Sequence, residues 1–309
     1  MNMAWREMDI VTSGVDNLSL DRRLRLEEAQ AFAERFMAHE ILLEVSLPAK
    51  VSKFQLLLGS IILFKGGVSG LVRDRILAAM LLVYHGLALH EDVGEDAANQ
   101  SRRGRLTILG GDYYSSLFYR LLAEAGRVDL VNKFAEAVVK INIAKTSLHE
   151  SRNDGSYRPE HYICDVMIVQ GALLQALRAA FAPDPATESL LDAALRAGVY
   201  DDELCKLNRP EVLTLANVLV GAAATPDERR QINRVESFVS VLAGEKRTAS
   251  LHAQYGITGR LFQGFRDAAL RLQALSTEMF GLDGWMQLSA LFETATGAGP
   301  SQASVVEGS

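Results

Sequence analysis

A run of acidic residues followed by an arginine pair is the part of this 309-residue sequence with the clearest potential for chemistry. Four acids, Glu91, Asp92, Glu95 and Asp96, lie within six residues at the end of an apolar stretch. On a helix, Glu91 and Glu95 share one face, because residues four apart are neighbours. Mg²⁺ takes one or two protein carboxylates and completes its shell with water and phosphate oxygens. We therefore identify Glu91, Asp92 and Glu95 as candidate metal ligands.

The arginine pair Arg102-Arg103 follows seven residues after Glu95. Guanidinium groups match the geometry of phosphate oxygens, so a metal site and an arginine pair together indicate a diphosphate ligand. A second interpretation stays open at this point. The acids can be a solvated helix end that forms ion pairs with the arginines, because charge runs of this kind are common on surfaces.

Helices are the elements that would position these residues. No segment alternates between apolar and polar residues with a period of two, so we expect an all-α protein. The almost continuous apolar character of residues 69–89 places that helix among other helices. Hydrophobic periodicity and helix-breaking residues predict helices at 21–47, 50–64, 69–89, 107–124, 129–150, 159–181, 187–197, 209–223, 227–243 and 257–281.

Pro183-Asp184-Pro185 is the strongest interruption in the chain and the predicted boundary between two parts of the bundle. We expect residues 1–20 to be a lead-in, 21–182 to carry the motifs and 186–294 to add further helices of the same bundle. Residues 295–309 are small and polar, which predicts a disordered tail.

Composition excludes several classes of function. The net charge of −6 and the lack of a basic stripe argue against nucleic-acid binding. Cys164 and Cys205 are far apart, without the spacing of a zinc site. The longest apolar run, 76–89, is shorter than the ~20 residues that a transmembrane helix needs. With no apolar signal core near Met1, we expect a cytoplasmic protein without a transmembrane segment, which makes peripheral contact with a membrane surface.

The order of these motifs resembles that of the trans-polyprenyl diphosphate synthases. It runs from an apolar helix to His90-Glu91-Asp92-x-x-Glu95, Arg102-Arg103-Gly104, Gly111-Asp112 and Lys145-Thr146. The sequence is most similar to the small subunit, component 1, of the heterodimeric heptaprenyl and hexaprenyl diphosphate synthases. That resemblance covers residues 25–180 and is carried by the Leu-Thr to Tyr-Tyr-Ser run at 106–115 and by Ile-Asn-x-x-Lys at 141–145.

The resemblance implies an isoprenoid-synthase-like helical bundle. The carboxylates of Glu91, Asp92 and Glu95 take the positions of the family's first aspartate-rich motif, in which Mg²⁺ bridges the allylic diphosphate. Two of the three are glutamates here, and their longer side chains shift the carboxylate oxygens relative to the near-octahedral geometry that Mg²⁺ requires. Binding of the prenyl diphosphate is implied for Arg102, Arg103 and Lys145, and for His90 we expect a structural role at the helix end.

Two differences from the catalytic members decide the functional expectation. Their Gly-Lys-x-x-Arg motif, which holds isopentenyl diphosphate, has no counterpart in residues 50–65. The nearest candidate for their second aspartate-rich motif is Asp201-Asp202-Glu203, which we interpret as a loop or helix N-cap. Without both acidic motifs, the three-metal clamp that ionises the allylic diphosphate cannot form, and this clamp provides most of the rate acceleration.

We therefore expect the non-catalytic small subunit of a heptaprenyl-type diphosphate synthase. A catalytic large subunit would hold most of the Mg²⁺ and would elongate farnesyl diphosphate with isopentenyl diphosphate for the menaquinone side chain. Two alternatives stay open. The chain can be a self-sufficient class I prenyltransferase or terpene synthase with a variant Glu-Asp-x-x-Glu motif, or a prenyl-lipid-binding helical scaffold.

Two further groups have alternative interpretations. Gly86 and Leu87 precede the acidic run by one helical turn, where the family's side chains form the floor of the tunnel that limits product length, but they can equally be core. The aromatic stripe of Tyr113, Tyr114 and Phe118 is core or, as we expect for a small subunit, an interface with the catalytic partner.

Overall fold

The structure is a computed structural model, and it describes residues 20–43, 51–91, 102–151, 157–207, 214–225 and 250–292. Helices are the regular elements of these ranges, which contain no strand, so the all-α prediction is confirmed. The helices are α1 (Leu20–Leu24), α2 (Leu26–Met37), α3 (Glu40–Leu43), α4 (Lys53–Lys65), α5 (Gly70–Glu91), α6 (Arg102–Glu124), α7 (Asp129–Glu150), α8 (Pro159–Phe181), α9 (Pro185–Lys206), α10 (Leu215–Ala223) and α13 (Ile257–Ser289).

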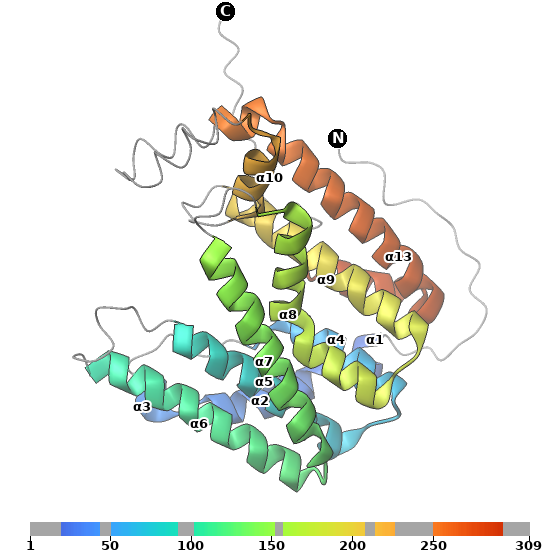
Figure 1. Cartoon of the computed structure of the whole chain (residues 1–309). Coiled ribbons are helices and arrows are strands. Elements are labelled where there is room, and N and C mark those ends of the chain that lie inside the picture. Colours follow the sequence, from blue (N-terminus) through green and yellow to red (C-terminus); the bar gives the residue numbers. More distant parts are fainter. Residues whose placement is uncertain are drawn as a thin grey trace, which may run out of the picture.

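Three pairs of long helices make up most of the bundle (Figure 1). α5 packs along α6, α7 along α8, and α9 along α13. α4 contacts α5 of the first pair and α8 of the second pair, while α2 covers α5. A single cluster of buried apolar side chains extends through all of them. The end of α5 and the start of α6, where the acidic run and the arginine pair lie in the sequence, belong to the same helix pair.

α4 and α8 have different surroundings in the bundle. Residues 56–63 of α4 are buried without interruption, as expected for a helix that is apolar all round. α8 is the one helix in the described ranges that is long and apolar enough to cross a membrane by length and composition. It packs against α4, α7, α9 and α10, and core helices of this length and composition are common, so its apolar character has a packing explanation.

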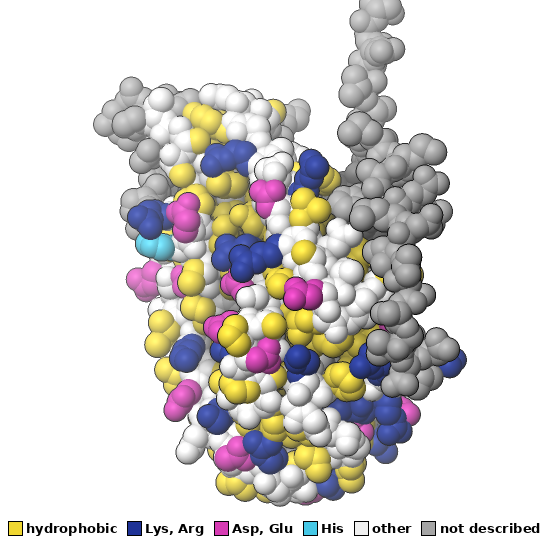
Figure 2. All heavy atoms as spheres, turned by 90° about the vertical axis from the view of Figure 1, so that its right-hand side faces the viewer, with side chains coloured by type: hydrophobic (Ala, Val, Ile, Leu, Met, Phe, Trp, Pro, Cys, Tyr) yellow, Lys and Arg dark blue, Asp and Glu magenta, His cyan; other side chains and the backbone are white. Residues whose placement is uncertain are grey.

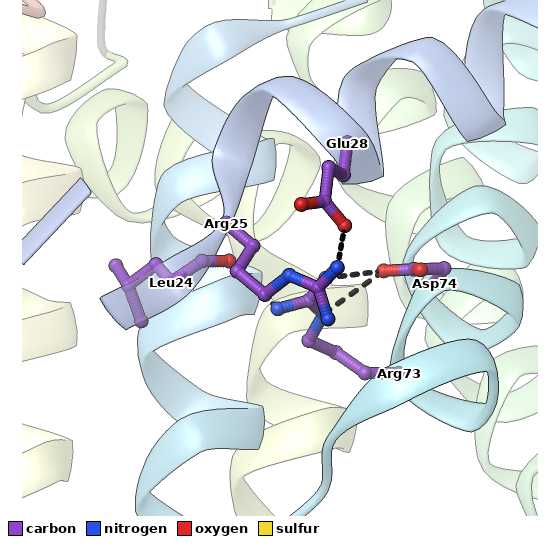
Figure 3. Close-up of polar contacts among 5 residues, drawn as sticks. All are labelled: Leu24, Arg25, Glu28, Arg73 and Asp74. Atoms are coloured by element: carbon purple, nitrogen blue, oxygen red, sulfur yellow. Dashed lines mark hydrogen bonds and ion pairs between the residues drawn. The ribbon is translucent and has the colours of Figure 1, made fainter. Parts of the chain in front are cut away.

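The prediction of one continuous helix at 21–47 is wrong, because the chain leaves helical geometry after Leu24 and again after Met37. Arg25 has a left-handed backbone, with φ 47°. The cause lies on α5, where the buried Arg73 donates from Nη1 to the Leu24 carbonyl at 2.8 Å and from Nη2 to Asp74 at 2.6 Å (Figure 3). Arg25 itself pairs with Glu28.

The C-terminal helices are longer than predicted. α9 does not end near residue 197 but continues through Gly198 to Lys206, and the Phe54 ring packs on Gly198, 3.1 Å from the position of a Cβ. α13 continues to Ser289, with one non-helical residue at Gly281, where φ is 73°. Asp201-Asp202-Glu203 therefore lies in the last turns of a helix, and its interpretation as a loop or N-cap is wrong.

Other boundaries follow the local signals. Asp184 caps α9, since its Oδ1 accepts the Thr187 amide at 2.9 Å, and the core continues across this position. α7 and α8 begin and end where the sequence predicted. The predicted helix at 227–243, most of the lead-in at 1–20 and the tail at 295–309 lie outside the described residues.

Candidate functional site

The contact between α5 and α6 is unusually close at the end that carries the candidate site. A Cβ on Gly86 would lie 3.3 Å from the carbonyl oxygen of Gly111 and 3.4 Å from Ser115 Oγ. A Cβ on Gly111 would lie 2.5 Å from the His90 ring. Glycine at both positions therefore lets the two helix backbones approach each other. Gly86 has no side chain that could narrow a tunnel, and its surroundings are α6 backbone and side chains.

His90 links the two helices through Asp112. Its Nε2 lies 3.8 Å from Asp112 Oδ1, and both side chains are well exposed. A contact of this length between solvated groups contributes little to stability. Gly110 and Gly111 thus serve helix packing, and the structural role expected for His90 stays a prediction.

The aromatic stripe of α6 divides into buried and exposed residues. Tyr114 is buried, donates its hydroxyl to the Met37 carbonyl at 2.8 Å and meets the His85 ring at 4.8 Å. Burial raises the pKa of Tyr114 to about 12 and lowers that of His85, so both side chains are neutral near pH 7. Tyr113 lies against the His39 ring at 4.8 Å and stays partly exposed.

Phe118 is buried between the Tyr119 and Phe134 rings, while Tyr119 is half exposed. Leu87 is half-buried against the core. The exposed apolar side chains of α6 are therefore Leu109, Tyr113 and Tyr119. These three lie within one arc of the helix, since their spacings of four, six and ten residues keep them on one side.

Lys145 lies on α7 and is half-buried. It has an interaction within the chain, so it is not a free cation. The hydroxyl of the following Thr146 donates to the Asn142 carbonyl, at 2.9 Å. Glu91, Arg102 and Arg103 belong to helix ends whose backbone is described, but their side chains, like Asp92 and Glu95 altogether, lie outside the described residues.

The second acidic cluster, at the end of α9, is used inside the fold. Glu203 is 1% exposed and accepts hydrogen bonds from the Tyr162 hydroxyl at 2.7 Å and the Leu215 amide at 2.6 Å. Burial raises its pKa, and the nearby Lys206 opposes that shift. Lys206 also pairs with Asp202 at 2.7 Å. These carboxylates join α9 to α8 and to the first turn of α10, and no group of three potential metal ligands occurs in the described part of the chain.

The arrangement of motifs on this bundle corresponds to a known family. A model of the family described as heptaprenyl diphosphate synthase (HEPPP synthase) subunit 1 matches residues 48–239, which is more than half of the sequence. The chain belongs to this family. The resemblance seen in the motifs at 90–145 is therefore confirmed.

A sequence relative supports the same assignment. Heptaprenyl diphosphate synthase component 1 of Geobacillus stearothermophilus is 38% identical over 104 residues, which cover 34% of this chain and 46% of that relative. Less than half of the relative's length is thus matched.

Solved structures show the fold. The decaprenyl diphosphate synthase of Rhodobacter capsulatus has a TM-score of 0.73 at 16% identity, over 91% of this chain and 99% of that one. The heptaprenyl diphosphate synthase of Staphylococcus aureus has a TM-score of 0.69 at 13% identity, over 90% and 99% of the two chains. At such identities the likeness concerns the fold alone, and it confirms the predicted isoprenoid-synthase-like helical bundle.

Sequence reasoning missed the residues that the α9 cluster engages. Tyr162 and Leu215 are 41 and 12 residues from Glu203 in the chain, and no local pattern connects them. One signal was present, because Glu203 is followed directly by Leu204, and a carboxylate beside an apolar helix position that is buried needs partners.

Proposed function

We propose that this chain is the non-catalytic subunit of a two-chain, heptaprenyl-type diphosphate synthase. A catalytic partner subunit would hold most of the Mg²⁺ and would elongate farnesyl diphosphate with isopentenyl diphosphate. The long prenyl product would serve the menaquinone side chain, and the complex would work in the cytoplasm in peripheral contact with the membrane. Membership of a subunit 1 family and the fold support this proposal.

The observation that carries the proposal is the engagement of the α9 carboxylates. Class I chemistry needs two acidic clusters that share metal ions around one diphosphate, and this electrostatic stabilisation supplies most of the rate. In this chain Glu203 is buried with two hydrogen-bond donors, and Asp202 is paired with Lys206. Metal binding would have to break these contacts and leave the Tyr162 hydroxyl and Leu215 amide unsatisfied.

The exposed apolar face of α6 supports a role as an assembly partner. Leu109 and Tyr119 are 60% and 51% exposed, and Tyr113 lies between them in the sequence. The next helix, α7, exposes Val139 and Ile143, four residues apart on one face. Exposed apolar residues that recur on one helix face are typical of interfaces between subunits. We propose that Tyr113 contacts the catalytic subunit, with Tyr114 and Phe118 supporting it from the core beneath.

Reconstitution tests the proposal. The chain and the catalytic polyprenyl diphosphate synthase subunit of the same organism would be purified separately. Extension of farnesyl diphosphate with isopentenyl diphosphate would be measured for each alone and for the mixture. We expect turnover in the mixture and little in either chain alone. Sustained turnover by this chain alone would instead support the self-sufficient prenyltransferase.

The interface is tested with two α6 substitutions. Replacing Tyr113 and Tyr119 together by Ser should weaken association with the catalytic subunit by about tenfold or more, because aromatic anchors dominate such interfaces. Leu270→Ser on α13, also exposed, is the control and should leave association unchanged. If both variants associate equally well with the catalytic subunit, α6 is not part of the interface.

A further inference from the structure

A groove of about 1000 Å³ runs along α8 and is also lined by residues of α7 and α9. Figure 1 shows these three helices next to one another. α10 contributes Leu215 and Leu219 to its wall, and α13 contributes Arg260. Neither Lys145 nor Asp201-Asp202-Glu203 lines this groove, and it takes no residue from α5 or α6. It is therefore separate from the candidate site described above.

The floor of the groove is an apolar face of α8 that the chain leaves partly uncovered. Met167, Ile168 and Ala176 lie on it and are half-buried. Only 39% of the most apolar 18-residue window of α8 is buried within the chain. Half-buried apolar side chains on the floor of an open groove leave contact area that an apolar ligand can cover.

Charged side chains form the rims of the groove, and cations exceed acids. They are Lys133, Lys140, Arg178, Arg196 and Arg260 against Glu136, Glu160 and Asp192, a net charge of +2 in a chain whose net charge is −6. Arg178 and Arg196 have acidic partners, at 3.6 Å and 3.9 Å. Lys140 and Arg260 form no ion pair with any residue that the structure describes. A basic rim over an apolar floor favours an amphiphilic anion.

The dimensions of the groove suit a long, thin ligand. The lining residues of α8 extend from Pro159 to Ala179, and a helix of that length spans about 30 Å at 1.5 Å per residue. The volume lies at the upper end of the range for small-molecule sites, about 300–1000 Å³. A single extended hydrocarbon chain fills such a shape, and a phosphorylated head can reach the rim lysines of α7.

We propose that this groove binds a single long prenyl chain with a diphosphate head, and so holds the product tail on this subunit. The choice of a prenyl diphosphate rests on the proposed function, whereas the apolar floor and basic rim are properties of the chain itself. The binding experiment therefore uses the full-length chain without the catalytic subunit, so the two proposals fail separately.

The two native cysteines provide a direct measurement. Cys164 is exposed and lines the groove, while Cys205 lies on α9 outside it. Alkylation of each thiol by iodoacetamide would be followed by mass spectrometry, with geranylgeranyl diphosphate as the probe. We expect Cys164 to react about tenfold more slowly when the probe is at ten times its Kd, with Cys205 unchanged. Inorganic pyrophosphate and phosphatidylglycerol vesicles should not protect Cys164.

Three results would overturn the proposal. They are no protection of Cys164 by geranylgeranyl diphosphate, equal protection of both cysteines, and protection by vesicles or pyrophosphate alone. If Cys164 is unprotected while reconstitution succeeds, the groove proposal fails by itself. If Cys164 is protected while reconstitution fails, the two-subunit proposal fails by itself.

Substitutions locate the binding. Ile168→Asp on the floor, and the double charge reversal Lys133→Glu with Lys140→Glu on the rim, should each weaken geranylgeranyl diphosphate binding by about tenfold or more. The rim lysines are exposed, so that variant leaves the core unchanged if Ile168→Asp affects folding. Leu270→Asp and Arg266→Glu on α13 are the matched controls and should bind like the wild type.

The controls come from the side of the molecule on which α13 lies, shown in Figure 2. Basic, acidic and hydrophobic side chains are mixed across that face. Leu270 and Arg266 are exposed residues of α13 and do not line the groove. Equal loss of binding in the controls and the groove variants would show that general surface charge is responsible, and would overturn the proposal.

Discussion

The ends of α5 and α9 both carry acidic residues, but the fold uses the two ends differently. At the end of α5, two glycines bring α6 close, and His90 and Asp112 meet at the surface. At the end of α9, Glu203 is buried and joins three helices. The pair described at the α5 end, His90 with Asp112, is therefore exposed, whereas Glu203 belongs to an internal hydrogen-bond network. Burial and partners, rather than acid content, separate a structural cluster from a candidate metal site.

The largest effect that would sharpen this comparison is expected at Glu203. Replacing Glu203 by Ala leaves the Tyr162 hydroxyl and the Leu215 amide without an acceptor in a buried position. We expect a loss of about 3 kcal/mol in the free energy of unfolding, measured by denaturant titration. The control is Asp202→Ala, whose partly exposed ion pair is worth at most about 1 kcal/mol. Similar values for both variants would mean that the α9 cluster is not an internal network.

At the α5 end, the comparison predicts that packing rather than charge determines stability. Gly86→Leu places a side chain against the Gly111 carbonyl, 3.3 Å from the Cβ position, and should cost about 2 kcal/mol. Gly259→Leu on α13 is the control, because nothing lies within 4 Å of its Cβ position. Thermal unfolding of both variants would test this, and an unchanged Gly86→Leu protein would argue against close helix contact.

The titration of Glu203 gives a pH test of the same comparison. Burial raises the pKa of Glu203 in the folded chain above its ordinary value near 4.5. Between the ordinary pKa and the raised pKa, the folded chain therefore binds more protons than the unfolded chain. The contribution of Glu203 to the free energy of unfolding therefore falls as pH rises through that window and is constant above it. The stability of the wild type relative to Glu203→Gln should fall in the same window. A relative stability that rises with pH there would contradict the burial of Glu203.

A smaller effect is expected at the aromatic stripe. Tyr114→Phe removes the hydroxyl that donates to the Met37 carbonyl and should lower the free energy of unfolding by about 1 kcal/mol. Tyr113→Phe, at a partly exposed ring, should have no measurable effect on unfolding. Equal effects at both positions would mean that the division into a buried and an exposed tyrosine is wrong.

Local signals predicted much of the fold. α7 and α8 have the predicted bounds because a charged first turn, the Ser-Arg-Asn-Asp-Gly loop and Pro159 act within a few residues. The break at Arg25 was missed because its cause, Arg73, lies 49 residues from Leu24. The continuation of α9 was missed for a similar reason, since Phe54 packs on Gly198 from another helix.

The site could be predicted only in part. Motif order identified the acidic run, the arginine pair and the Gly-Gly-Asp segment as one region, but not the close contact of α5 with α6. The buried role of Glu203 and the groove along α8 depend on which helices meet, which a single sequence does not specify. Lys133 and Lys140 look like ordinary surface lysines until α8 is placed beneath them.

The most direct test of a non-catalytic role is to remove the first acidic motif within the reconstituted complex. Glu91, Asp92 and Glu95 would be replaced together by Ala, and incorporation of isopentenyl diphosphate by the complex with the catalytic subunit measured at saturating Mg²⁺. The account predicts that most of the activity is retained, because the partner holds the catalytic metal ions. A loss of about 100-fold or more, with association of the two chains intact, would contradict it.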